Sequence, residues 1–136
     1  MQAAVHFAQS LADETRWRIL LLLWEQPLCV CELADILDMP QSSVSSHVQV
    51  IRRADLLESE RREKRVYYRV ARAFLPVLTV LRKHFNLHPE SVTLLTRDAK
   101  RRIKRLAERE KSCCPMPQEL AVKTRKRSTA AVGATA

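Results

Sequence analysis

Apolar residues recur at helical spacing through most of the chain and predict a mainly α-helical protein. The second predicted helix begins after Asp13, a good capping residue, and is apolar on all sides from Trp17 to Trp24. A helix of that kind belongs in the middle of a domain. The predicted helices cover residues 2–12, 14–24, 29–37, 41–53, about 75 to near Pro89, and about 90–111.

Two of these helices are separated by only three residues, Asp38-Met39-Pro40. Short helices joined by such a turn form a helix-turn-helix motif. Strand-forming residues at 57–60 and 66–70 then flank the sequence Arg61-Arg62-Glu63-Lys64-Arg65, which predicts a β-hairpin with a basic tip. The expected fold class is therefore mainly α with a small β-hairpin.

The charge balance indicates an anionic partner. The 136 residues carry 24 Lys and Arg against 15 Asp and Glu, a formal net charge of +9. Nucleic acid is the usual partner of a small basic domain, and solubility alone is the other explanation of such a charge. The longest apolar run, Ile19 to Trp24, is far shorter than the roughly 20 residues that cross a bilayer, and the N-terminus lacks the pattern of a signal peptide. We therefore expect a cytoplasmic protein with no membrane partner.

The second helix of the motif and the hairpin supply the side chains expected to contact double-stranded DNA. Major-groove readers place short polar side chains on the exposed face of that helix, and nearby cations hold phosphates. Residues 61–72 hold six basic residues against Glu63 alone, which favours phosphate contacts over a merely solvated charge run. For His47, packing or capping is the alternative. The predicted DNA-binding residues are Gln41, Ser42, Ser43, Ser45, Ser46, His47, Gln49, Arg52, Arg61, Arg62, Lys64 and Arg65.

Four cysteines are the candidate metal ligands. In the cytoplasm, cysteines more often serve metal or redox chemistry than structural disulfides, and soft thiolates select soft thiophilic ions. Cys29 and Cys31 supply two thiolates, and Cys113 or Cys114 would supply a third. The alternative for the first pair is a role as small buried hydrophobes. For the second pair it is an exposed tail feature or a separate site.

The spacing of Cys29 and Cys31 restricts how they can share an ion. Residues two apart on an ideal helix are rotated by about 200° from each other, given about 3.6 residues per turn. Both sulfurs can reach one ion only if Cys29 precedes the first helical turn, or if that turn unwinds. We favour unwinding, because it would shift the motif that follows and convert ion binding into a loss of DNA affinity.

Four segments of the sequence resemble one known family. They are Leu11-Ala12-Asp13-Glu14-Thr15-Arg16, Leu28-Cys29-Val30-Cys31-Glu32-Leu33, Ser45-Ser46-His47-Val48 and Val66-Tyr67-Tyr68-Arg69-Val70. With the order of the elements, they resemble the ArsR/SmtB family of winged-helix, homodimeric, metal-responsive repressors over about residues 5–110. Within that family the chain is most similar to arsenical resistance operon repressors, whose sensor segment has this Cys-Val-Cys sequence.

The resemblance implies a homodimeric repressor, not an enzyme, that binds operator DNA and has no constitutive cofactor. It implies release from DNA when As(III) or Sb(III) binds cysteine thiolates. Residues 1–111 would form the winged helix-turn-helix domain for DNA binding and dimerisation. Residues 112–136 would form a Cys-Cys/Pro segment and a basic, disordered tail.

The chain departs from the family at two places. Many relatives of the arsenical branch have a third cysteine where this chain has Ala34, and a cadmium and lead branch completes its site with N-terminal cysteines that this chain lacks. Cd(II), Pb(II), Zn(II) and thiol oxidation therefore stay as alternative signals. Relatives have glycine at the hairpin tip where this chain has Glu63, so we expect a loose wing without a tight turn of positive φ.

Overall fold

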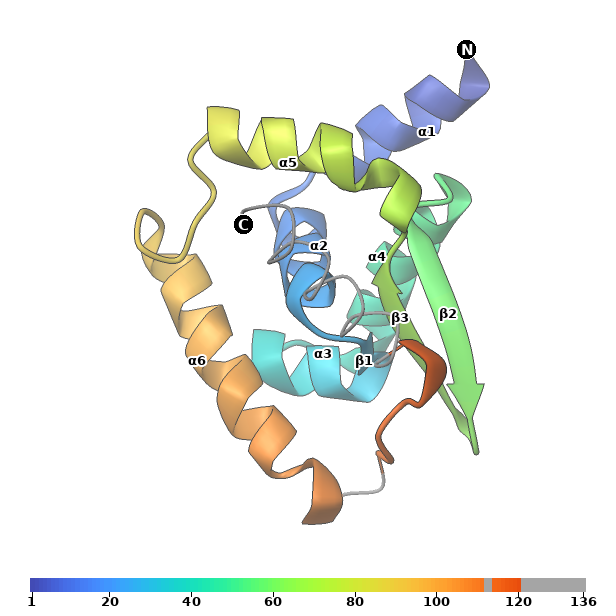
Figure 1. The fold of residues 1–136 in the computed structure, drawn as a ribbon, viewed down its shortest axis with the longest axis vertical. Coiled ribbons are helices and arrows are strands. Elements are labelled where there is room, and N and C mark those ends of the chain that lie inside the picture. Colours follow the sequence, from blue (N-terminus) through green and yellow to red (C-terminus); the bar gives the residue numbers. More distant parts are fainter. Residues whose placement is uncertain (112–113, 121–136) are drawn as a thin grey trace, which may run out of the picture.

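The computed structural model describes residues 1–111 and 114–120, and its elements follow the order of a winged helix-turn-helix protein (Figure 1). They are α1 (Gln2–Leu11), α2 (Glu14–Glu25), β1 (Leu28–Cys29), α3 (Val30–Leu37), α4 (Gln41–Arg53), β2 (Leu57–Arg62), β3 (Arg65–Val70), α5 (Leu75–His84) and α6 (Thr93–Ala107), with 3-10 turns at Arg72–Phe74 and Arg109–Lys111. The predicted helices and the predicted hairpin are confirmed. None of the described helices combines the length and the apolar character needed to cross a membrane.

Helix α2 forms the centre of the core. The Asp13 carboxylate accepts a hydrogen bond from the Arg16 backbone N–H at 3.0 Å and so caps the helix, as predicted. Ile19, Leu20 and Leu23 are fully buried, because α1, α4, α6 and β3 pack around this helix. Its apolar character on all sides therefore reflects a central position.

Helices α3 and α4 form the helix-turn-helix. Helix α3 ends at Asp38 in the left-handed conformation, with φ 54° and ψ 52°, and Pro40 is the N-cap of α4. Val44, Val48 and Ile51 are each 0% exposed. One face of α4 is thus fixed in the core, and the opposite face remains on the surface.

The hairpin β2–β3, which we call the wing, is tighter than expected. Arg62 pairs with Arg65, so only Glu63 and Lys64 form the loop, and Glu63 has φ 56°. The expectation of a loose wing was therefore wrong, because Glu63 adopts the positive φ that glycine usually supplies in two-residue hairpin loops.

A third strand, β1, was not predicted and completes the sheet in the order β1-β3-β2. It has only two residues, Leu28 and Cys29, which pair antiparallel with Tyr68 and Tyr67 of β3. The strand therefore fixes the chain immediately before α3 to the base of the wing.

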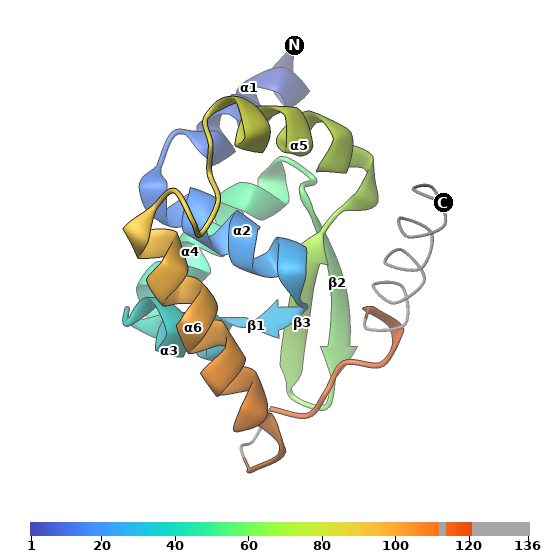
Figure 2. The same ribbon diagram turned by 60° about the vertical axis from the view of Figure 1, so that its left-hand side comes forward.

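Helix α6 lies across α2 and α3, on one side of the core (Figures 1 and 2). Arg18 of α2 donates two hydrogen bonds to Asp98 of α6, at 2.8 and 2.9 Å, and their side chains are only 9% and 3% exposed. The apolar side chains of this helix pack only in part, because Leu95 is buried whereas Ile103 is 62% exposed. A buried ion pair therefore fixes α6 to the core together with its apolar contacts.

Residues 114–120, which we call the C-terminal strap, run from the end of α6 to the wing (Figure 2). Cys114, Pro117 and Leu120 are buried against the domain. Cys113 and residues 121–136, which include the tail predicted to be disordered, lie outside the described residues. The described part of the cysteine and proline segment thus packs on the winged-helix domain.

Candidate metal site and nucleic-acid interface

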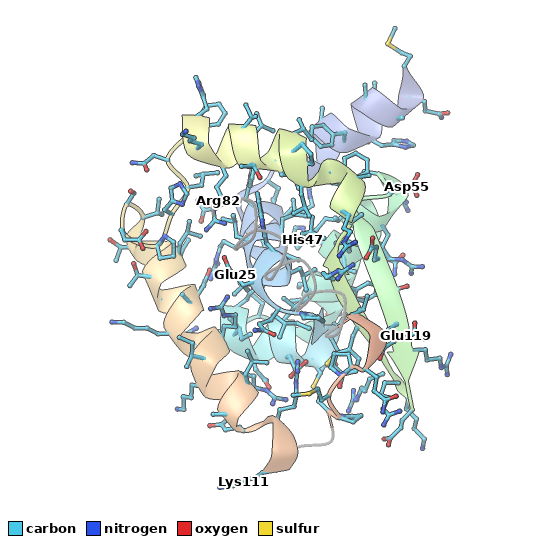
Figure 3. All side chains as sticks on the ribbon, in the orientation of Figure 1. Glu25, His47, Asp55, Arg82, Lys111 and Glu119 are labelled. Carbon is cyan, nitrogen blue, oxygen red and sulfur yellow. The ribbon has the colours of Figure 1, made fainter. Side chains whose placement is uncertain are left out.

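Three cysteine thiols meet at the start of α3. Cys114 Sγ lies 3.7 Å from Cys29 Sγ and 3.4 Å from Cys31 Sγ, and all three sulfurs lie within 4.8 Å of one another. Two sulfurs bound to one tetrahedral zinc at about 2.3 Å would be about 3.8 Å apart, so these separations suit a shared ion. Figure 3 shows the yellow sulfur atoms between α3 and the strap. Among the described residues, no fourth cysteine, histidine or carboxylate joins this cluster.

The first two thiols converge because Cys29 precedes the helix. Cys29 is the N-cap of α3, with extended φ −92° and ψ 167°, and Cys31 lies in the first turn. The Cys29 backbone N–H donates to Glu32 Oε1 at 3.2 Å, which fixes the N-cap conformation. The unwinding that we favoured is therefore not needed to bring the two sulfurs together, and the other arrangement, with Cys29 ahead of the first turn, is the one found.

The third thiol comes from the strap. Cys114 is 0% exposed and shares an apolar cluster with Cys29, Tyr67 and Leu120. Of the two candidates for this role, Cys114 therefore reaches Cys29 and Cys31, whereas Cys113 lies outside the described residues. The position was hard to choose from sequence, because both cysteines follow the last helix.

Two arginines from the end of α6 and the turn after it line the cluster. Arg105 Nη2 lies 3.7 Å from Cys114 Sγ and 3.9 Å from Cys31 Sγ, while its Nε donates to Asp35 at 2.9 Å. Arg109 donates to both carboxylate oxygens of the buried Glu32, at 2.9 and 3.0 Å. The Arg105 guanidinium therefore lies beside the sulfurs, and the Glu32–Arg109 ion pair lies at the N-cap of α3.

Tyr67 closes the cluster on the side of the sheet. Its side chain is 0% exposed, and its hydroxyl has no hydrogen-bond partner among the described residues. Burial raises the pKa of this phenol, and the neighbouring Cys29, Glu32 and Cys114 add to the rise. Tyr67 therefore stays neutral beside the thiols.

The buried thiols also resist ionisation. Burial raises the pKa of Cys29 above its ordinary value, against a smaller lowering by the Glu32 backbone N–H, and the Glu32 carboxylate and the other thiols raise it further. Burial is also the main reason that the pKa of Cys114 is raised. These two sulfurs are therefore uncharged at neutral pH.

Helix α4 presents most of the predicted DNA-reading residues. Gln41, Ser42, Ser46, Gln49 and Arg52 are exposed, and Ser43, Ser45 and His47 are half-buried. His47 lies back against the start of α2, where its Nδ1 is 3.3 Å from Arg16 Nη1 and 3.8 Å from Asp13 Oδ1 (Figure 3). This position agrees with the packing or capping alternative for His47 and leaves the other polar side chains as the candidate reading face.

The tip of the wing presents the predicted cations. Arg61 and Lys64 are exposed, and Arg62 and Arg65 are half-buried. The charge count over 61–72 overstated the cations available to DNA, because Arg69 is 3% exposed and forms an ion pair with Glu58. The basic surface of the wing therefore lies at its tip.

Sequence reasoning missed Glu60, Tyr67 and Arg105. The structure places all three around the strap or the thiol cluster. Glu60 did carry a signal, since it is an acidic residue beside the basic tip of the hairpin. Tyr67 and Arg105 carried none, because their contacts with the cysteines depend on how the sheet and α6 pack.

Part of the chain matches a protein-family model. Residues 13–59 match the family model described as "Bacterial regulatory protein, arsR family". This range contains α2, α3, α4 and the first residues of β2, and it includes Cys29 and Cys31. The match therefore covers the helix-turn-helix and two of the three clustered thiols.

Several curated proteins are similar to the same region. The arsenical resistance operon repressor of Escherichia coli K12 is 45% identical over 62 residues, which is 45% of this chain and 53% of that protein. The arsenic resistance transcriptional regulator ArsR1 of Pseudomonas putida KT2440 is 44% identical over 61 residues, 44% of this chain and 48% of that protein. The cadmium resistance regulatory protein CadC of Listeria innocua is 35% identical over 63 residues, 46% and 53% of the two chains. The chain thus spans about half the length of these relatives, whose names describe regulators rather than enzymes.

Solved structures share the fold. HlyU from Vibrio cholerae has a TM-score of 0.56 at 27% identity, over 62% of this chain and 92% of that one. The homodimeric winged helix-turn-helix DNA-binding domain Mb0332 from Mycobacterium bovis, a possible ArsR-family regulator, has a TM-score of 0.54 at 28% identity, over 64% and 85%. These similarities show a winged helix-turn-helix fold, and residues 13–59 of the chain are similar to the arsR family of bacterial regulatory proteins.

Proposed function

We propose that this protein is a transcriptional repressor that binds operator DNA as a homodimer and leaves it when As(III) or Sb(III) binds Cys29, Cys31 and Cys114. The observation that carries the proposal is the meeting of three thiols at the N-cap of α3. Helix α3 packs on α4, so an ion at this cap lies next to the candidate DNA-reading unit. The similarity to an arsenical resistance operon repressor and to an arsenic resistance transcriptional regulator supports the same assignment.

The chemistry of the donor set favours a trivalent metalloid. Three neutral thiols react with As(OH)₃ to give a tris-thiolate and three waters, so no charge is created in the buried site. Zinc in a structural site usually takes four ligands, and the described residues supply three sulfurs. Burying a net charge costs free energy unless the charge is paired, so the neutral product suits the buried Cys29 and Cys114.

A divalent ion is the second candidate, and one observation favours it. A tris-thiolate complex of Cd(II), Pb(II) or Zn(II) carries one negative charge, and the guanidinium of Arg105 lies 3.7 Å from Cys114 Sγ. The cadmium resistance regulatory protein CadC is similar over the same region. We rank this candidate second because Asp35 already binds the Arg105 guanidinium.

The DNA-binding part of the proposal rests on two surfaces. The exposed face of α4 supplies Gln41, Ser42 and Gln49, which suit groove contacts, and the tip of the wing supplies cations for phosphates. Dimerisation is proposed because the similar winged helix-turn-helix domain Mb0332 is homodimeric. A two-fold dimer would present two such surfaces to a palindromic operator.

The test is fluorescence anisotropy of the full, reduced chain on DNA from upstream of its own gene, titrated with arsenite, antimonite, cadmium and zinc. We expect release by the two trivalent species and loss of that response in Cys29→Ser/Cys31→Ser and in Cys114→Ser. Cys113→Ser is the matched control and should respond as the wild type does. Release by cadmium or zinc alone would favour the second candidate, and tight binding that no ion disturbs would refute the proposed signal.

A further inference from the structure

A carboxylate of the wing binds the strap through three successive backbone groups. Glu60 Oε2 accepts from Gln118 N–H at 2.8 Å, and Glu60 Oε1 accepts from Glu119 N–H at 2.6 Å and from Leu120 N–H at 3.0 Å. Hydrogen bonds to an ionised carboxylate are stronger than those between neutral groups. Figure 3 shows Glu119 beside β2, where these bonds form.

The other strand of the wing and the core hold the same part of the strap. Arg69 Nη1 of β3 donates to the Leu120 carbonyl at 3.3 Å, and the Leu120 side chain packs with Cys29 and Tyr67. Partial burial tends to raise the pKa of Glu60, but the three N–H donors outweigh it, and the pKa lies below its usual value. The Glu60 carboxylate is therefore ionised, and the strap is anchored at 118–120.

This anchor restricts where Cys114 can lie. Only three residues separate Cys114 from Gln118, and two of them, Pro115 and Pro117, have φ fixed by their rings. At the other end, Arg105 Nη2 contacts the Cys114 sulfur at 3.7 Å. The position of Gln118 on Glu60 therefore limits the position of the third thiol.

We propose that Glu60 is a positioning residue for the ion site, whose carboxylate anchors the strap and so holds the Cys114 thiol against Cys29 and Cys31. The inference rests on the proposed function, because it names the group that completes the same site. It also joins the ion site to the wing, so that a displacement of Cys114 is transmitted to the hairpin that carries the candidate phosphate contacts.

The test compares Glu60→Gln with Glu63→Gln in the full, reduced chain. Both substitutions remove one negative charge from the same hairpin, and Glu63 at the exposed tip makes no bond to the described strap. An amide at position 60 retains one acceptor oxygen but turns an NH₂ group toward a backbone N–H, so the anchor is broken. Arsenite affinity is measured by isothermal titration calorimetry.

We expect Glu60→Gln to bind arsenite about 10- to 100-fold more weakly, which is typical for loss of a group that orients a metal ligand. Glu63→Gln should bind as the wild type does. In a Cys114→Ser background, Glu60→Gln should have no further effect, because the thiol that it positions is gone. A general weakening of the fold would instead add its loss to that of Cys114→Ser and would overturn the positioning role.

Two further outcomes separate this inference from the proposed function. Wild-type arsenite affinity in Glu60→Gln, together with weakened binding in Cys114→Ser, would overturn the role of Glu60 and leave the three-thiol site standing. If the wild type does not bind arsenite, the proposed function fails. The anchoring role of Glu60 is then tested in the ion-free protein by the rate at which iodoacetamide alkylates Cys114, with peptide fragmentation to identify the modified cysteine. Faster alkylation in Glu60→Gln than in Glu63→Gln would support the anchor, and equal rates would refute it.

Discussion

Replacing Arg109 by methionine should strongly destabilise the protein, because it leaves a buried carboxylate without its cation. Arg109 donates two hydrogen bonds to Glu32, at 2.9 and 3.0 Å, and a third to the Pro27 carbonyl at 2.9 Å. Glu32 is 0% exposed, so Arg109→Met would leave it only the Cys29 N–H as a donor among the described residues. Removing one partner of a buried ion pair costs about 3–5 kcal/mol. For a chain of 136 residues, that loss lowers Tm by about 10–17 °C.

Urea and thermal unfolding followed by circular dichroism would measure the effect, with Arg53→Met as the control. Arg53 is exposed at the end of α4, and its replacement should change the free energy of unfolding by less than about 0.5 kcal/mol. The double variant Glu32→Gln/Arg109→Met should recover part of the loss, because it removes both charges of this buried pair. A loss below about 1 kcal/mol in Arg109→Met would refute the reasoning, since it would show that Glu32 is hydrated or protonated at little cost.

Three other predictions concern the phenol, the thiols and the wing. Tyr67→Phe should raise the free energy of unfolding by about 1 kcal/mol in urea titrations, because it deletes a buried hydroxyl that lacks a partner in the described part of the chain; a decrease would contradict this. Arsenite affinity should change little between about pH 6 and pH 8, because Cys29 and Cys114, whose pKa values are raised by burial, exchange as neutral thiols without net proton release. Cadmium affinity should instead rise about tenfold per pH unit for each thiol proton that the ion displaces. If calorimetry finds that arsenite affinity depends on pH as strongly as cadmium affinity does, the thiols are not neutral before binding. Arg61→Ala/Lys64→Ala should make DNA binding less dependent on salt. The slope of log affinity against log salt concentration should become shallower by about 0.9 for each phosphate that these two cations neutralise. An unchanged slope would show that the wing tip does not contact DNA.

The helices could be predicted because their signals are local. The capping residue Asp13 and the spacing of Val44, Val48 and Ile51 lie within or beside the helices that they define. Strand β1 could not be predicted, because two residues carry no periodicity and become a strand only by pairing with β3. The tight turn at Glu63 was excluded on residue preference, which the pairing of Arg62 with Arg65 overrides.

In the candidate site, too, the local features could be predicted from the sequence and the long-range contacts could not. The short spacing of Cys29 and Cys31 identified two thiols, but their geometry depended on the N-cap position, which the sequence left open. The sequence could not show that Cys114 supplies the third thiol, because the position of Cys114 depends on a long-range contact. Glu60, which is distant in the chain, binds the strap that contains Cys114. For Arg69 the sequence predicted a functional role that the structure does not support. This residue was counted among the cations that face DNA, but it is buried beside Glu58 and Leu120.

The distance along the chain between the clustered thiols has a consequence for the lifetime of the protein. Cys114 lies 85 residues from Cys29 and 83 from Cys31, so an ion bound to all three would be a covalent cross-link between distant parts of the domain. On a polymer model, closing a loop of that length destabilises the unfolded chain by about 4.6 kcal/mol. On the proposed function, the signal that removes the repressor from DNA would therefore also protect it from unfolding and proteolysis, and a reserve of intact protein would be ready to rebind when the metalloid is gone.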